Sequence, residues 1–288
     1  MHKFRFVVLS IVFLLGMASA YAQDNKASPV ITLERTACFG TCPIYTISIF
    51  ENGEVVYNGE KFVTVTGEQK GQIDPETVAA MVKAFENAGY FDWKEAYDTQ
   101  MVTDLPSVIT SVTRNGETHR IDHYMGDNAT PVALPYLEQW IDVMTNSQLW
   151  TGAEFNFASI SNGTDSPLIT LERGACFGFC PVYNLAAYKD GSIVKMGIAN
   201  VQDLGVSVMK VDTFAIEGVV QQAQALGYFD WKDRYDTQVK TDQTTVVSSV
   251  RWEDQYKQIF RYNGDPNAPV GLVWIEDSID ALVSNPAS

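Results

Sequence analysis

The sequence predicts an α+β fold that is built twice: two tandem copies of a mainly antiparallel sheet, each with two helices packed on one face. The first observation is an internal repeat at a constant offset of 138 residues, with 44 identical pairs in 115 aligned positions from 31 to 145. The second is that each copy places alternating apolar segments and tight turns beside two amphipathic helical patterns. The period is far longer than that of a solenoid, so each copy is expected to form a domain with its own core.

Strands are predicted where apolar and polar residues alternate. Tyr45, Ile47 and Ile49 alternate with polar residues, and the turn Asn52-Gly53 follows them. Asp190-Gly191 occupies the place of this turn in the second copy, and both dipeptides are typical of β-hairpins. A second hairpin is predicted through 108–112, Asn115-Gly116 and 121–124. The expected order in each copy is strand, cysteine loop, hairpin, helix, hairpin, helix.

Helices are predicted from their capping residues and apolar stripes. Asp74 followed by Pro75 is a typical start, and Gly89 is a typical left-handed end. Asp212 and Gly227 bound the counterpart helix in the second copy. The second helix of each copy is expected to begin near residue 131 or 269, although a proline at 135 leaves open a start at that residue.

The chain divides into four segments by composition. Residues 1–22 resemble a secretory signal peptide, with Lys3 and Arg5, the apolar run Phe6–Leu15, and a small-residue cleavage site before Gln23. The apolar run is too short to cross a bilayer, which needs about 20 residues. The first repeat domain is expected over 28–146, a linker over 147–166, and the second repeat domain over 167–288.

The charge balance excludes one class of partner. The chain has 20 Lys and Arg against 35 Asp and Glu, which gives a formal net charge of -15. A nucleic-acid binder needs basic side chains to displace counterions, so no nucleic-acid partner is predicted. The sequence predicts an acidic, exported protein with no membrane span in the mature chain, either periplasmic or secreted. It is not a lipoprotein, because no cysteine lies near the cleavage region.

All four cysteines lie in two C-x-x-x-C-P motifs. Matched spacing in an oxidising compartment favours disulfides, and pairing within each copy, Cys38 with Cys42 and Cys176 with Cys180, is favoured among the three pairings. In an extended strand, cysteines four residues apart would lie roughly 13 Å from each other, so each loop must fold back.

The cysteine motif and its flanks resemble a known family. Ile31-Thr32-Leu33-Glu34-Arg35, leading into Cys38-Phe39-Gly40-Thr41-Cys42-Pro43, looks like the start of the domain of unknown function 6438 family. Thr103-Asp104-Leu105-Pro106 also matches, whereas the second copy departs from the pattern at Gln243-Thr244. The resemblance covers most of the mature chain. It implies an exported, mostly bacterial domain and no known activity.

A thiol-redox or Cu(I) site is the main alternative for the cysteines. The motif is similar to the thiolate pair of Sco-type copper chaperones. Here it leads into a hairpin rather than a helix, so no helix N-terminus is expected to lower a cysteine pKa. His119 and His123 lie roughly 13 Å apart on one strand face, too far to bind one zinc, and that face is expected to be exposed. No metal or cofactor is predicted.

Catalysis finds little support in the sequence. The sequence contains no G-x-S-x-G or H-E-x-x-H motif, no phosphate loop and no calcium-loop pattern. A carboxylate-based hydrolase is the second alternative, because three aspartates recur in both copies: Asp92, Asp98 and Asp104, and Asp230, Asp236 and Asp242. Capping and turn roles explain such residues equally well.

The leading hypothesis is a non-enzymatic binding or envelope-associated module. Its partner, a protein or a small ligand, is unknown. The candidate binding surface combines the repeated aromatic cluster with the recurring aspartate of each copy; its residues are Trp93, Tyr97, Asp104, Trp231, Tyr235 and Asp242. The alternative for the aromatic residues is core packing behind the first helix of each copy.

Overall fold

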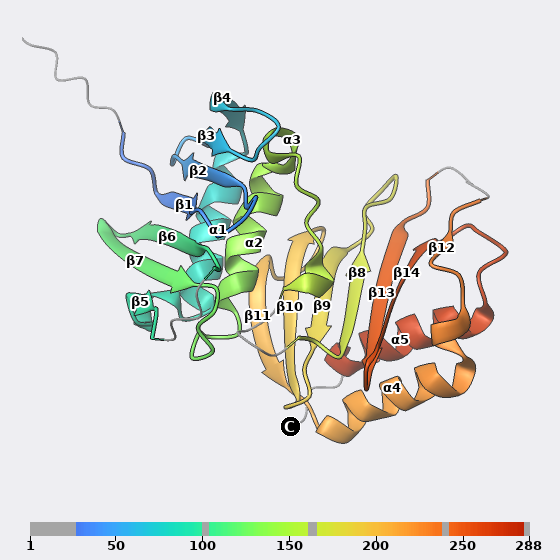
Figure 1. The fold of residues 1–288 in the computed structure, drawn as a ribbon. Helices are drawn as coiled ribbons and strands as arrows, with labels where there is room; N and C mark the ends of the chain where they lie inside the picture. The colour runs from blue at the N-terminus through green and yellow to red at the C-terminus, as the bar shows by residue number, and fades with distance from the viewer. Residues whose placement is uncertain (1–26, 100–103, 161–165, 238–241, 285–288) are drawn as a thin grey trace, which may run out of the picture.

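The computed structural model describes residues 27–99, 104–160, 166–237 and 242–284. Each repeat forms one sheet of seven strands, and the two sheets have the same strand order. The first sheet runs β4-β3-β2-β1-β6-β7-β5, and the second runs β11-β10-β9-β8-β13-β14-β12 (Figure 1). The predicted α+β fold in two copies is confirmed.

The elements of the first repeat are β1 (Ile31–Arg35), β2 (Ile44–Ile49), β3 (Glu54–Lys61), β4 (Gly67–Gln72), α1 (Pro75–Asn87), η1 (Tyr90–Asp92), β5 (Ala96–Tyr97), β6 (Ser107–Arg114), β7 (Glu117–Tyr124) and α2 (Leu134–Thr145). Those of the second repeat are β8 (Ile169–Arg173), β9 (Val182–Ala187), β10 (Ser192–Ala199), β11 (Gly205–Lys210), α4 (Thr213–Leu226), η3 (Tyr228–Asp230), β12 (Arg234–Tyr235), β13 (Thr245–Trp252), β14 (Gln255–Tyr262) and α5 (Val270–Ser284). Between them lie α3 (Gln148–Thr151) and η2 (Phe157–Ser159).

The sequence-based element order was incomplete at two places in each copy. It lacked β4 and its counterpart β11, and the two-residue strands β5 and β12. β4 is an exposed edge strand of sequence GEQKGQ, which has no apolar alternation to reveal it. β5 and β12 pair in parallel with β7 and β14, while the other strand pairs in both sheets are antiparallel.

The helix ends follow the predicted caps. The Asp74 side chain accepts a hydrogen bond from the Glu76 amide, and Asp212 does the same for the Phe214 amide. Gly227 ends α4 at a φ of 81°, a left-handed conformation that favours glycine. α2 begins at Leu134, with the proline at 135 in its first turn, where its missing amide costs no helical hydrogen bond.

Each sheet buries its inner face against its own two helices. In the first repeat, Ile31 and Leu33 of β1 and Ile47 of β2 have no exposed surface, and they join Phe85 of α1 and Ile141 of α2 in one core. The second repeat builds its core from the corresponding strands, with α4 and α5. The apolar face of each sheet therefore packs against the apolar stripes of its helices, as predicted.

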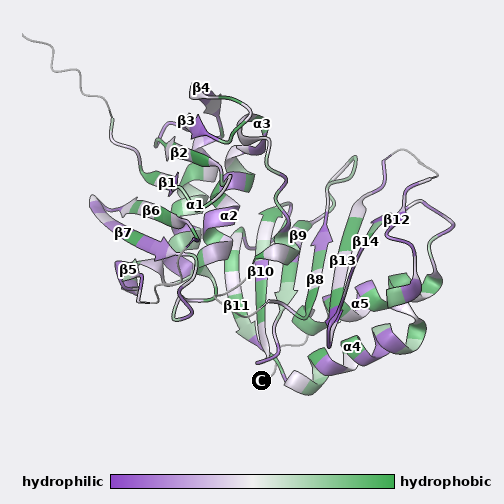
Figure 2. Cartoon of the chain, in the orientation of Figure 1, coloured by the Kyte–Doolittle hydropathy of each residue, from purple (hydrophilic) through white to green (hydrophobic). Residues whose placement is uncertain are grey.

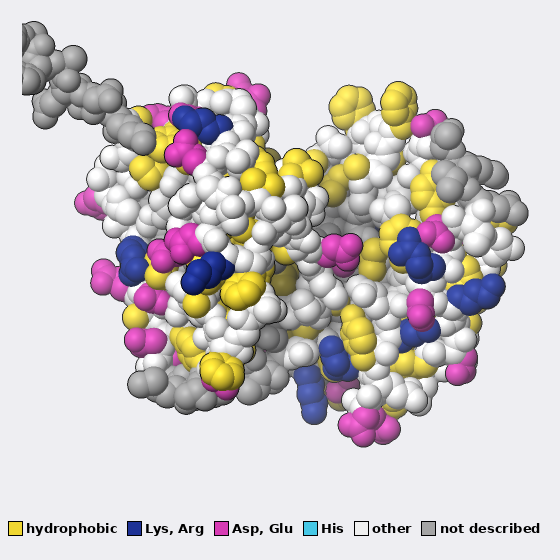
Figure 3. Space-filling model, turned by 45° about the horizontal axis from the view of Figure 1, so that its top comes forward, with side chains coloured by type: hydrophobic (Ala, Val, Ile, Leu, Met, Phe, Trp, Pro, Cys, Tyr) yellow, Lys and Arg dark blue, Asp and Glu magenta, His cyan; other side chains and the backbone are white. Residues whose placement is uncertain are grey.

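The two repeats are stacked so that α1 and α2 lie between both sheets (Figure 1). Sheet residues Ala186, Val194, Met196 and Val206, on the outer face of the second sheet, belong to the same hydrophobic core as the first repeat. The layers therefore follow the order sheet, helices, sheet, helices. The space-filling view shows the surface hollowed between the two repeats (Figure 3).

Hydrogen bonds join the repeats across this shared core. Trp140 Nε1 donates to the Gly197 carbonyl at 3.0 Å, and the hydroxyls of Tyr136 and Tyr188 lie 2.6 Å apart. Because Trp140 is fully buried, its indole N–H needs such a partner.

Only the second sheet has an outer face suited to this contact. At the positions of Ala186, Met196 and Val206, the first copy carries polar residues, Ser48, Asn58 and Glu68. β9 is largely hydrophobic green in Figure 2, in keeping with its burial on both faces. The duplicated copies have therefore diverged at the residues that decide which sheet is covered.

The segment between the repeats packs on the first repeat through two aromatic side chains, and its short helix η2 contacts β8 of the second repeat. Trp150 lies 5.2 Å from the Tyr57 ring, and its carbonyl accepts a hydrogen bond from the Val65 amide. Phe157 is buried against Tyr136, with ring centroids 5.1 Å apart.

We expect Gly205→Ala to destabilise the protein more than Gly67→Ala, the same change at the equivalent position. Both glycines have positive φ, 95° and 82°, so each substitution carries a strain of roughly 1–2 kcal/mol. A methyl group at 205 would also lie 2.2 Å from Ala84 Cβ, whereas nothing lies within 4 Å at 67. Overpacking of this kind adds about 1–3 kcal/mol. Urea unfolding measures the difference, and equal losses of stability would argue against the shared core.

Candidate functional site

Both cysteine motifs form disulfides within their own copies. Cys38 pairs with Cys42 at a Cα–Cα distance of 5.8 Å, and Cys176 pairs with Cys180 at 5.7 Å. All four cysteines of the chain are thereby paired. The local pairing is confirmed, and thiolate chemistry would first require the disulfides to be reduced.

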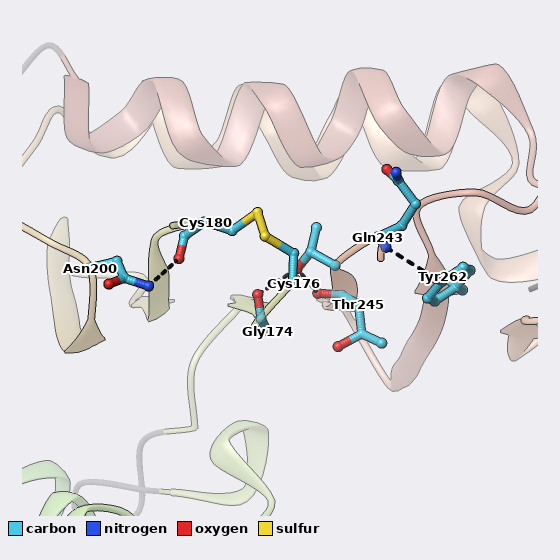
Figure 4. Close-up of a disulfide and its surroundings, with 8 residues drawn as sticks. Gly174, Cys176, Cys180, Asn200, Gln243, Thr245 and Tyr262 are labelled. Atoms are coloured by element: carbon cyan, nitrogen blue, oxygen red, sulfur yellow. Dashed lines mark hydrogen bonds between the residues drawn. A yellow bond between two sulfur atoms is a disulfide. The ribbon is translucent and has the colours of Figure 1, made fainter. Parts of the chain in front are cut away.

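Each disulfide loop leaves the end of a central strand and is anchored to its surroundings. In the first copy, the Phe39 amide donates to the Asp104 carbonyl at 3.2 Å, and the Thr36 amide donates to the Ser107 carbonyl at 3.0 Å. In the second copy, Asn200 Nδ2 donates to the Cys180 carbonyl at 3.2 Å (Figure 4). Covalent closure and these bonds together limit the conformations of the loops.

Phenylalanines stand exposed on both loops. The exposed fractions are 88% for Phe39, 87% for its counterpart Phe177, and 93% for Phe179. Single exposed apolar residues are normal on protein surfaces. Here the exposed phenylalanines recur on the equivalent loop of both copies. Because a disulfide closes each loop, these apolar side chains stand in water on a backbone with restricted conformations.

The recurring aspartates at 104 and 242 lie at the starts of β6 and β13. Both are exposed and have positive φ, 100° and 83°. Through its carbonyl, Asp104 is joined to the disulfide loop, and Leu105 beside it is 46% exposed. The structure thus brings Asp104 together with Phe39, a pairing that the sequence did not indicate.

The aromatic part of the predicted surface packs mainly on the core. Tyr97 and Tyr235 are only 5% and 6% exposed, and the Tyr97 hydroxyl accepts a hydrogen bond from the Lys94 amide. Trp93 and Trp231 are half-buried against the cores, close to the buried tyrosine that begins each short 3-10 helix. The two tyrosines therefore belong to the interior, as the core-packing alternative expected.

The expectation of an exposed histidine face was wrong. His123 is 3% exposed, because its strand face turns toward α2, and its Nδ1 lies 2.8 Å from a carboxylate oxygen of Glu138. Arg261 and Glu276 form the equivalent buried ion pair in the second copy. A cation–carboxylate pair therefore links β7 to α2, and β14 to α5.

A second repeated network joins the sheet to the same helix. Arg35 donates to Asp142 at 2.6 Å through Nη2, and the Tyr45 hydroxyl donates to the other carboxylate oxygen at 2.7 Å. The second copy repeats the set as Arg173, Tyr183 and Asp280. Sequence reasoning missed this network, although identity of its residues between the copies was a signal for it.

A third repeated set of hydrogen bonds holds the segment that follows β5 and, in the second copy, β12. The Asp127 carboxylate, which has no exposed surface, accepts hydrogen bonds from the Thr99 amide and hydroxyl. In the second copy, hydrogen bonds from the backbone amides of Asn267 and Thr237 lower the pKa of Asp265 to about 2. Asp127 and Asp265, each preceded by a glycine and related by the repeat, thus have a structural role.

The recurring aspartates of the first copy are not joined to one another in the described structure. Asp92, Asp98 and Asp104 are exposed, and no hydrogen bond connects their side chains within the described ranges. In the part of the chain that the structure describes, no group of three or more His, Cys, Asp or Glu side chains is placed to hold a metal ion.

The family model for the domain of unknown function 6438 (DUF6438) matches the chain twice, over residues 29–145 and 167–283. The chain belongs to the DUF6438 family. A comparison with curated proteins found no match. Each DUF6438 repeat contains one disulfide loop, one buried cation–carboxylate pair and one Arg–Asp–Tyr network.

Removal of one disulfide is expected to cost about 2 kcal/mol, because a loop this small loses little conformational entropy on closure. The change is Cys38→Ser with Cys42→Ser, and the matched change is Cys176→Ser with Cys180→Ser. Urea unfolding measures both, and the two losses should add because each disulfide closes a loop within its own repeat. Complete unfolding of either variant would show that the disulfide supports more than its loop.

The His123–Glu138 pair predicts a stability change with pH. Burial of the imidazole lowers its pKa, but the charge and hydrogen bond of Glu138 raise it more, so the pKa of His123 lies above its ordinary value. The stabilisation from this ion pair is complete below about pH 6.5, the pKa of histidine in the unfolded chain. It is lost as the pH rises through the higher pKa of His123 in the folded protein. The Tm difference between the wild type and His123→Gln should therefore shrink from pH 6 upward.

His119→Gln is the control for this measurement. His119 lies on the same strand, and no ion pair involves it within the described residues. A His123→Gln difference that stays constant with pH would contradict the charged pair.

Proposed function

We propose that this chain is an exported, non-enzymatic binding protein whose two DUF6438 repeats engage a protein partner through their disulfide loops. The observation that carries the proposal is the exposure of Phe39, Phe177 and Phe179 on covalently closed loops in both copies. Asp104 and Leu105 extend the same surface in the first copy.

The physical argument concerns the cost of binding. Association costs conformational entropy wherever an interface must become ordered, and a closed loop has less of that entropy to lose. Burial of a phenylalanine side chain contributes about 1.5–3 kcal/mol. Exposed aromatic side chains on constrained loops therefore favour binding, and such anchors commonly dominate protein interfaces.

Export is supported by the N-terminal pattern and by the disulfides. Residues 1–22 carry the charged, apolar and small-residue regions of a signal peptide. Disulfides persist in oxidising compartments, which the periplasm and the cell exterior provide. Within the described ranges, no helix is long and apolar enough to cross a membrane.

The proposal predicts that the loops crosslink to the partner. The photoreactive analogue p-benzoylphenylalanine would replace Phe39, Phe177 or Phe179 in the full chain, in cells that express the protein. We expect adducts of one molecular mass from these positions. Phe39→Ser or Phe179→Ser should then weaken binding of the purified partner about 10- to 100-fold, from the lost apolar burial.

Phe214 is the matched control. It is 77% exposed, but it lies at the start of α4 and outside the disulfide loops. The same analogue at 214 should give no such adduct, and Phe214→Ser should leave binding unchanged. Equal crosslinking from all four positions, or none from the loops, would refute the proposal.

A further inference from the structure

The hollow between the repeats contains two adjoining cavities on the outer face of the second sheet (Figure 3). Their volumes are about 640 and 250 Å³, and Phe155, Glu172 and Val247 line both of them. Small-molecule sites commonly measure about 300–1,000 Å³. We call the two together the linker cleft, because the segment 154–157 forms one wall.

Both cavities of the linker cleft lie over strands of the second sheet. α2 covers the outer face of β10 and β11, and the linker then crosses the same sheet near β8 and β13. Glu172 on β8 lies beneath this cover and is half-buried, whereas its counterpart Glu34 on β1 is exposed. The arrangement of the repeats, rather than the repeat sequence itself, therefore creates the cleft.

The Glu172 carboxylate has no partner in the cleft. No hydrogen bond or ion pair involves it among the described residues, and burial alone raises its pKa to about 7. The neighbouring guanidinium of Arg173 points to the opposite face of the sheet, where it pairs with Asp280. A desolvated carboxylate without a cation is costly for a protein, and such groups concentrate at functional sites.

The other charged groups of the cleft do not neutralise Glu172. Lys257 pairs with Asp233, and Arg234 pairs with Asp236. Glu154 on the linker adds a further negative charge to the wall. The formal charges of the lining balance, but Arg173, Arg234 and Lys257 are each paired with an aspartate. Among the described residues, Glu172 and Glu154 are therefore the lining carboxylates without a cationic partner.

Two further features define what the cleft accepts. The wall is aromatic at Phe155, Tyr256 and Phe260. The guanidinium groups of Arg234 and Arg251 stack on the Phe260 and Tyr256 rings, so Phe155 offers the aromatic surface that carries no stacked cation among the described residues. Gln139 of α2 lines the smaller cavity, and its amide nitrogen is buried without a hydrogen-bond partner in the described structure. An unpaired buried donor costs free energy that an acceptor on a ligand would recover.

We propose that the linker cleft binds a small organic cation, a primary ammonium compound with an apolar body and a hydrogen-bond acceptor. Glu172 is its counter-ion, Phe155 contacts its apolar body, and the Gln139 amide donates to its acceptor. The smaller cavity adjoins the base of the second disulfide loop, where Gly174 and Val182 line it, but the exposed phenylalanines of the loops do not line the cleft.

The test uses phenylalaninol, which carries an ammonium group, a phenyl ring and a hydroxyl acceptor, with the full mature chain. The neutral analogue 3-phenylpropan-1-ol lacks only the amine. NMR titration should show saturable binding of phenylalaninol, and binding about tenfold or more weaker for the neutral analogue, because the charge-assisted hydrogen bond is lost. Glu172→Gln should weaken phenylalaninol to the same extent, and Glu172→Asp should retain part of the binding.

Glu34→Gln in the first repeat is the matched control, because the same motif position is exposed there. It should leave binding unchanged. No saturable binding to the folded protein, equal binding of the neutral analogue, or equal loss in both variants would overturn the proposal. Phe39→Ser should also leave amine binding unchanged. The amine site and the proposed loop surface are therefore tested by separate results.

A second readout follows the Glu172 carboxyl group directly. A bound cation stabilises the ionised carboxylate, so phenylalaninol should shift the titration of Glu172 to lower pH and release protons near pH 7. The NMR shift of the Glu172 carboxyl carbon reports this change, which a purely structural role of the residue would not produce. An unchanged titration at saturating phenylalaninol would exclude Glu172 as the counter-ion.

Discussion

Burial of α1 and α2 on both of their faces is the constraint on which the rest of the structure depends. Each helix layer of an α+β sandwich normally covers one sheet. Here the helices of the first repeat also cover the second sheet, through Trp140, Tyr136 and the close approach of Gly205 to Ala84. This contact sets the position of the second repeat, directs the linker across β8, and so forms the linker cleft.

The two copies have kept their internal polar contacts while their outer faces have diverged. The Arg–Asp–Tyr network joins sheet to helix in both repeats. The second cation–carboxylate pair uses His123 in one copy and Arg261 in the other, so the same geometry has different sensitivity to pH. A buried pair left without one partner is costly, which explains why a cation stands at this position in each copy. The outer residues are under no such restriction.

The two proposed surfaces occupy different parts of the fold. The disulfide loops extend from the ends of the central strands, where a closed backbone presents apolar side chains. The linker cleft lies on the flat face of the second sheet, between elements that are far apart in the sequence. The exposed phenylalanines of the loops do not line the cleft, although Gly174 and Val182, at the base of the second disulfide loop, do.

Local signals determined much of this protein from sequence alone. The hairpin turns, the caps at Asp74 and Asp212, and the disulfide pairs all depend on residues close together in the chain. The repeat at an offset of 138 residues is visible from identity of the two copies, without any knowledge of their contacts. The edge strand β4 was not predicted from the sequence, because it faces solvent and has no apolar pattern. Burial of His123 and the unpaired Glu172 were decided only by the tertiary structure. Each depends on what packs over a strand face, and the identical motif position is exposed at Glu34 and covered at Glu172. Alternation of residues along a strand shows which side chains share a face, but the packing of distant segments decides which face is covered.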